Sequence, residues 1–142
     1  MPSLKIHLKM TNQIHFILIL SIAIIFSGTT YGGHLYKEKE YQECWCSQVN
    51  GVIEYVLPDR TRVDCLTDNY AVEFDFAEKW AESIGQTLYY SIMTKRKPGI
   101  VVIIENPKDE KYLKRLKLVI KDLKLNIMVW TITPFDIEQN HH

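Results

Sequence analysis

The stretch Val63-Asp-Cys-Leu-Thr-Asp-Asn-Tyr-Ala-Val-Glu-Phe-Asp-Phe76 contains two short strand patterns joined by a turn signal. The segments Arg62–Leu66 and Ala71–Phe76 have the length and side-chain alternation of β-strands. Between them, Thr67-Asp-Asn-Tyr70 carries residues that are typical of turns. Because so short a turn joins neighbouring antiparallel strands, the stretch predicts a β-hairpin.

The acidic side chains of this hairpin are expected on one side of the sheet. Successive strand residues face opposite sides, so Glu73 and Asp75 share one face and Phe74 lies on the other. Asp64, on the preceding strand, can lie beside Glu73. Carboxylates that converge from adjacent strands make an oxygen site suited to magnesium. The same pattern is also compatible with acids that alternate along a solvated sheet face.

The sequence before the hairpin predicts a helix and a further strand. The charged segment from Leu35 to about Gln48 has apolar residues at helical spacing, and Asn50-Gly51 ends it. Val52–Leu57 then has a strand pattern that stops at Pro58-Asp59. With the hairpin, this strand forms an antiparallel meander.

The sequence after the hairpin alternates between helices and strands. Helices are predicted from Ala77 to about Met93 and from about Lys108 to Lys124. The apolar runs Gly99–Ile104 and Ile127–Thr133 are typical of buried strands. This order predicts right-handed crossovers and parallel strands, and therefore an α/β domain with a mixed central sheet.

A polar stripe follows the acidic strand along the first of these helices. Lys79, Glu82 or Ser83, Gln86 and Tyr90 recur at helical spacing on one side. Because the helix begins directly after the acidic strand, this stripe can overhang the carboxylates. On a plain amphipathic helix the same stripe is a solvated face.

The ordered combination of these elements resembles the PD-(D/E)XK nuclease superfamily, over about residues 36–133. The shared features are an Asp on one strand, a Glu on the next, a helix with Gln86-Thr-Leu-Tyr-Tyr90, and the αβββαβ order of a restriction-endonuclease-like core, here extended by a further αβ unit. The helix element is similar to that of RecB-type and resolvase-like members. The resemblance implies metal-dependent hydrolysis of nucleic acid, with magnesium or manganese as cofactor.

The resemblance also assigns roles to individual residues. Asp64 and Glu73 match the two metal ligands, and Glu38 matches an acid sometimes contributed by the first helix, where Glu40 or Glu43 are alternatives. Gln86 and Tyr90 match the pair that orients active-site groups or substrate phosphate.

One position departs from the family pattern. Asp75 stands where the family has a lysine, so Lys79, one helical turn later, is the candidate replacement. Asp75 is alternatively a further metal ligand, or the site is inactive.

The N-terminus has the organisation of a signal peptide. Lys5 and Lys9 precede the apolar run Phe16–Phe26, and small and polar residues follow up to Gly33. We therefore expect residues 1–32 to be a signal peptide, residues 33–142 to be one domain, and the protein to be exported to the periplasm or secreted. An uncleaved membrane anchor is the alternative.

The cysteines agree with export to an oxidising compartment. Cys44 and Cys46 would form a strained ring if joined, so a disulfide from one of them to Cys65 is expected, and we favour Cys46.

The net charge counts mildly against non-specific nucleic-acid binding. Residues 33–142 contain 15 Lys and Arg and 17 Asp and Glu, a net charge of −2 with His neutral, whereas proteins that bind phosphates non-specifically usually have a basic excess. A nucleic-acid partner would need a local basic surface, and Lys95-Arg96-Lys97 and a basic helix offer candidates. Such a helix is more often a solvated face, and its basic residues spread around more than one side, which favours that interpretation. These residues are Lys111, Lys114, Arg115, Lys117, Lys121 and Lys124.

Two functions therefore fit the sequence. One is an exported metal-dependent nuclease. The other is a catalytically inactive domain of the same fold that binds a partner in the cell envelope or the secreted fraction.

Overall fold

A computed structural model describes residues 33–140 and shows an α/β domain built on one open, mixed, five-stranded sheet. The strand order is β1-β2-β3-β4-β5, which is also the order along the chain. The strands are β1 (Val52–Val56), β2 (Arg62–Leu66), β3 (Tyr70–Phe76), β4 (Lys97–Ile103) and β5 (Met128–Ile132). The helices are α2 (Glu38–Gln48), α3 (Trp80–Thr94), α4 (Glu110–Asp122) and α5 (Pro134–Asn140), with short 3₁₀ turns at Ala77–Lys79 and Pro107–Asp109.

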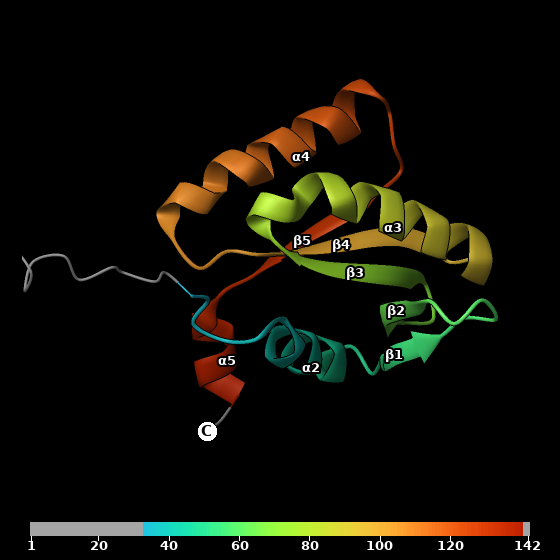
Figure 1. Ribbon diagram of the computed structural model, residues 1–142, viewed down its shortest axis with the longest axis horizontal. Helices are drawn as coiled ribbons and strands as arrows, with labels where there is room; N and C mark the ends of the chain where they lie inside the picture. The colour runs from blue at the N-terminus through green and yellow to red at the C-terminus, as the bar shows by residue number, and fades with distance from the viewer. Residues whose placement is uncertain (1–32, 141–142) are drawn as a thin grey trace, which may run out of the picture. The chain divides into compact units, whose positions relative to one another are not determined.

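The sheet topology confirms the expected combination of a meander and two crossovers. Strands β1, β2 and β3 are antiparallel neighbours, and β3, β4 and β5 are parallel. Helices α3 and α4 connect the parallel strands and cover one face of the sheet, while α2 and α5 lie on the other (Figure 1).

Each face of the sheet has its own apolar cluster. On the α2 side, Phe74 and Val101 pack with Tyr41 of α2 and Ile137 of α5. On the other side, Ile100 and Val102 of β4 pack with Leu113 and Leu116 of α4 and with partly buried residues of α3. The β-branched residues of β4 are buried on both faces, which explains why its sequence is an uninterrupted apolar run.

Thr87 joins α3 to the middle of the sheet. It is completely buried, and its hydroxyl donates to the carbonyl of Gly99 at 2.8 Å and accepts from the Gly99 amide at 2.9 Å. A second contact, at 3.3 Å, reaches the carbonyl of Ala71 in β3. Because the threonine side chain is small and its hydroxyl is hydrogen-bonded, α3 packs close to β3 and β4 without leaving this buried polar group unpaired.

The element boundaries differ from the predicted ones at several places. Helix α2 begins at Glu38 rather than Leu35, since Lys37 is extended and its amide is capped by Glu40. Strand β4 begins at Lys97 instead of Gly99, because Lys97 pairs with Tyr70 and donates its amide to Asn69.

Helix α5 was not predicted. It begins at Pro134, and Asp136 accepts hydrogen bonds from the amide and hydroxyl of Thr133, which caps the helix. The sequence Thr133-Pro-Phe-Asp136 therefore carries a helix-start signal, a cap residue followed by proline and a reciprocal acid.

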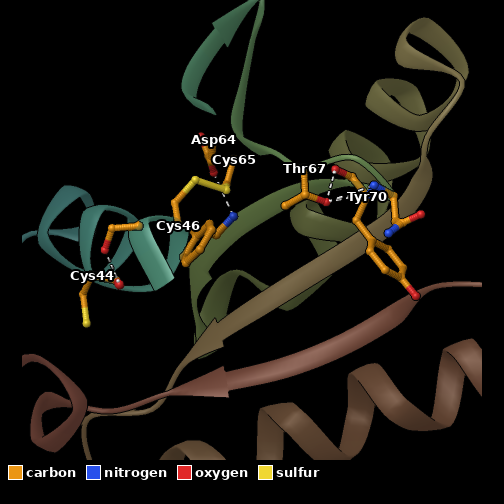
Figure 2. The surroundings of a disulfide bond; sticks show 9 residues. Cys44, Cys46, Asp64, Cys65, Thr67 and Tyr70 are labelled. Atoms are coloured by element: carbon orange, nitrogen blue, oxygen red, sulfur yellow. Dashed lines mark hydrogen bonds between the residues drawn. A yellow bond between two sulfur atoms is a disulfide. The ribbon is translucent and has the colours of Figure 1, made fainter. Parts of the chain in front are cut away.

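The predicted disulfide between Cys46 and Cys65 is present and links α2 to β2 (Figure 2). Gly51 passes directly against it, and a Cβ at this position would collide with the sulfur atoms of both cysteines. Cys44 is free and partly buried, and its sulfur accepts a hydrogen bond from Asn140 at 2.8 Å.

The expected signal peptide or anchor, residues 1–32, lies outside the described residues. Within residues 33–140, no helix is long and apolar enough to cross a membrane.

Candidate functional site: a buried carboxylate cluster at the β2–β3 split

Strands β2 and β3 separate at Asp64, which opens the edge of β3. The two strands pair only at Cys65–Val72 and Leu66–Ala71. Beyond that point the Asp64 carboxylate accepts the amide of Phe74 at 2.7 Å, where a strand carbonyl would otherwise be expected (Figure 2). The Asp64 side chain thus replaces a backbone carbonyl as the acceptor for a β3 amide. This contact holds the Asp64 carboxylate beside β3.

Glu73 and Asp75 are buried beneath α3, so they do not lie on a solvated sheet face. Glu73 and Asp75 are each only 5 % exposed. Asp75 accepts a hydrogen bond from the buried hydroxyl of Ser83 at 3.0 Å. In contrast, Oε2 of Glu73 is buried and has no hydrogen-bond partner within the described part of the chain. A side-chain hydrogen bond between Glu73 and Asp64 contributes to the pKa values of both acids. The unpartnered group is thus one buried oxygen of Glu73, and leaving it unpaired is costly.

Burial and mutual repulsion shift the pKa values of these acids. Burial is the main reason that the pKa of Glu73 is raised, and the charges of Asp64 and Asp75 raise it further. The pKa of Asp64 is also raised, chiefly by burial and against the lowering effect of the Phe74 amide. Burial raises the pKa of Asp75 to about 6, although the Ser83 hydrogen bond opposes this. The cluster therefore favours bound protons or a bound cation over three bare charges.

Lys79 supplies a positive charge at the rim of the cluster. Its ammonium lies 3.7 Å from Oδ1 of Asp75, and its side chain is half exposed. The residue precedes α3 and follows the acidic strand by about one turn, and it lies next to Asp75, as the spacing in the sequence predicted. The structure thus brings Lys79 and Asp75 together.

Glu38, at the start of α2, lies close enough for its charge to raise the pKa values of Asp64, Glu73 and Asp75. Burial is the largest cause of its own raised pKa, and Lys79 opposes that shift. The amide of Gln42, which is nearly completely buried, donates to Glu38 at 3.2 Å. Of the three acids considered in the first helix, Glu38 is therefore the one that faces the cluster.

The two helix residues suggested by the resemblance have different surroundings. Tyr90 is buried with Val63 and Ala71. Burial raises the pKa of its phenol, and the negative charges of Glu73 and Asp64 raise it further. Gln86 lies on the same stripe of α3, between Ser83 and Tyr90, but it is exposed. It is thus available to a ligand, whereas Tyr90 is held by the protein.

Two residues of the site were not singled out by the sequence. Ser83 was only an alternative to Glu82, and its role becomes visible from its hydrogen bond to Asp75. Glu54 lies opposite Asp64 in the β1–β2 register, has a φ of 54°, and accepts from Arg62 at 3.0 Å. Counting the register back from the predicted hairpin would have placed Glu54 near Asp64.

The acids of the cluster carry the oxygen ligands that hard divalent cations prefer, but they are not assembled as a metal site. Within residues 33–140, no group of three or more His, Cys, Asp or Glu side chains is positioned to hold a metal ion. Oxygens of Asp64 and Asp75 are engaged by protein donors, and Oε2 of Glu73 is not. Carboxylates that supply one or two ligands and leave the remainder to water are typical of magnesium sites.

The fold and the site together define an α/β domain with a buried carboxylate cluster at the split between two strands. No protein-family model, no characterised protein and no solved structure matches the chain.

Proposed function

We propose that this protein is an exported, metal-dependent nuclease with a PD-(D/E)XK-like core. One observation carries the proposal: Glu73 is buried beside Asp64 with a carboxylate oxygen that has no partner. An arrangement that costs free energy in the empty protein is reasonable if it holds a cation during function. The basic and apolar N-terminal sequence supports export.

The proposed ligands are Asp64 and Glu73, with Glu38 and Asp75 as further acids around magnesium or manganese. When bound, such an ion polarises a phosphate oxygen and lowers the pKa of a coordinated water. The backbone amide of Phe74 orients Asp64, and the hydroxyl of Ser83 orients Asp75. These contacts hold the carboxylates in place before any substrate arrives.

Lys79 is the proposed electrostatic partner of the reacting phosphate. Its ammonium is next to Asp75 but half exposed, so it can reach a phosphate at the rim. A cation in this place stabilises negative charge that builds up on the phosphate oxygens. Gln86 is exposed on the same side of α3 and is available to orient the substrate.

The test is cleavage of single- and double-stranded DNA and RNA, with and without magnesium or manganese. Asp64→Asn and Glu73→Gln should each abolish metal-dependent cleavage, and Lys79→Ala should lower it about 100-fold. Asp68→Asn, in the exposed turn between the same strands, is the matched control and should keep full activity. If the wild type cleaves none of the substrates with either metal, the chain is not a nuclease of this kind.

A second function is favoured by one specific observation. Asp75 occupies the position of the family lysine, and it is bonded to Ser83 and Lys79. A domain that keeps the fold but has lost the lysine could bind a nucleic acid, protein or envelope component without cleaving it. Metal binding without cleavage, or neither, would favour this function.

A further inference from the structure

Helix α4 carries a concentration of positive charge that the carboxylate site does not use. The segment 107–124 contains seven Lys and Arg and three Asp and Glu, a net charge of +4. Residues 33–142 as a whole have a net charge of −2, so the remainder of the domain has −6. Seven of the 15 Lys and Arg of residues 33–142 thus lie in this segment, five of them within α4 itself.

The outward side of α4 combines these cations with an exposed leucine. Leu118 is 58 % exposed, although leucine is usually buried. Residues three and four positions away lie beside it on a helix surface, and these are Lys114, Arg115, Lys121 and the acid Asp122. Lys111 lies two turns away on the same side. We call Lys111, Lys114, Arg115, Leu118 and Lys121 the cationic face.

Asp122 is the acid that borders the cationic face. Within residues 33–140, no ion pair joins a basic side chain of α4 to a carboxylate, even though Asp122 is on the same helix. All five residues of the face are exposed. Such a surface attracts an anionic partner.

The surroundings of Leu118 and Tyr112 help to decide whether the anionic partner is a nucleic acid or a membrane. Nucleic-acid backbones are bound by charge, and their bases are bound by stacking on open aromatic rings. The nearest ring, Tyr112, is partly buried and has the cations of Lys111 and Arg115 at 4.6 and 5.5 Å from its centroid. In contrast, a central aliphatic side chain ringed by lysines is suited to the headgroup region of a bilayer.

We propose that the cationic face of α4 docks this domain on the surface of a membrane that contains anionic lipids. The lysines and Arg115 contact lipid phosphates, and Leu118 enters the boundary between headgroups and acyl chains. This inference does not depend on the proposed nuclease function, since it uses a different surface.

The test is cosedimentation of the full-length chain with vesicles of phosphatidylcholine, alone or with one quarter phosphatidylglycerol. Lys114→Gln/Arg115→Gln/Lys121→Gln should weaken partitioning to the anionic vesicles about 100-fold, since each cation near such a surface contributes about fivefold. Leu118→Ser should weaken it about tenfold. All substituted side chains are exposed, and circular dichroism can verify that the variants fold.

A matched control variant distinguishes the effect of the cationic face from the effect of total net charge. Lys37→Gln/Lys39→Gln/Arg60→Gln removes three exposed cations elsewhere and should weaken partitioning less than threefold. The N-terminal apolar sequence is the same in every protein, so its contribution cancels between variants.

Three results would overturn the proposal. One is equal binding of the wild type to neutral and anionic vesicles, and another is an equal loss in the control variant. The third is normal vesicle binding by Leu118→Ser combined with loss of binding to a 20-base-pair DNA duplex by the α4 triple variant, which would assign the face to nucleic acid.

Discussion

Glu73 is the residue on which the account of the site depends. The residue is only 5 % exposed, and one of its carboxyl oxygens has no donor in the described part of the chain. Asp64 and Asp75 add negative charge from two neighbouring positions. A glutamine of the same shape would remove this repulsion, so the native Glu73 makes the folded protein less stable than glutamine would. The proposed function needs an acid at this position.

Stability should therefore fall as pH rises. Raised pKa values mean that the folded state keeps protons on Glu73, Asp64 and Asp75 that the unfolded chain has already released. The stabilisation from these groups is complete below their unfolded pKa values, near 4, and is lost as the pH passes through the folded values. Denaturant unfolding should show a decreasing free energy of unfolding between pH 5 and pH 8.

Glu73→Gln should reduce that decrease by at least about 1 kcal/mol. Glu43→Gln, on the exposed side of α2, is the control and should leave the pH profile as in the wild type. Glu105 has a lowered pKa, which hydrogen bonds from Tyr41 and His34 produce against the effect of burial, so it titrates below this window. A Glu73→Gln profile that coincides with the wild type would show that Glu73 carries no strain.

At the scale of elements, the sequence predicted the order and pairing of strands better than the contacts at the site. Alternation in Ala71–Phe76 and the continuous apolar run of β4 each reflect a face that must be buried, so both strands and their neighbours could be predicted. Helix α5 was not predicted because its seven residues are too few to show a periodic apolar pattern. Its capping sequence is the signal that indicates a helix there.

The details of the site were less accessible from sequence for a physical reason. The pair Asp64 and Glu73 follows from hairpin register, and Lys79 follows from helical spacing. The burial of Asp75 by Ser83, and the exposure of Gln86, depend on how α3 rotates against the sheet. That rotation is set by Thr87, whose hydroxyl bonds to β4 and to β3. A sequence pattern carries no signal of such a tertiary contact.

The disulfide fixes α2 against β2, next to the position where β2 leaves β3. Cys46 and Cys65 are separated by 19 residues in sequence, and a bridge that closes a loop of this length contributes about 3 kcal/mol. Cys46→Ala/Cys65→Ala should lower the free energy of unfolding by about this amount, measured by urea denaturation. Cys44→Ala, two residues away, should have an effect of less than about 1 kcal/mol. An equal effect of both changes would show that the bridge adds nothing beyond side-chain packing.

At the scale of the whole molecule, the charges are divided between two surfaces. The acids Glu38, Asp64, Glu73 and Asp75 lie near one another at the strand split, whereas five of the 15 Lys and Arg of residues 33–142 lie on α4. A near-neutral total charge is therefore compatible with the proposed cation site and with the proposed anion-binding surface. Overall composition shows only the sum, which is why it gave limited support to any partner.

The most direct test of the account is calorimetric titration of the protein with manganese at pH 7.5. We expect a saturable site in the wild type that is at least tenfold weaker in Glu73→Gln and in Asp64→Asn, with no change in Glu43→Gln. Equal manganese binding by all four proteins, or none by the wild type at millimolar metal, would contradict the assignment of the carboxylate cluster as a metal site.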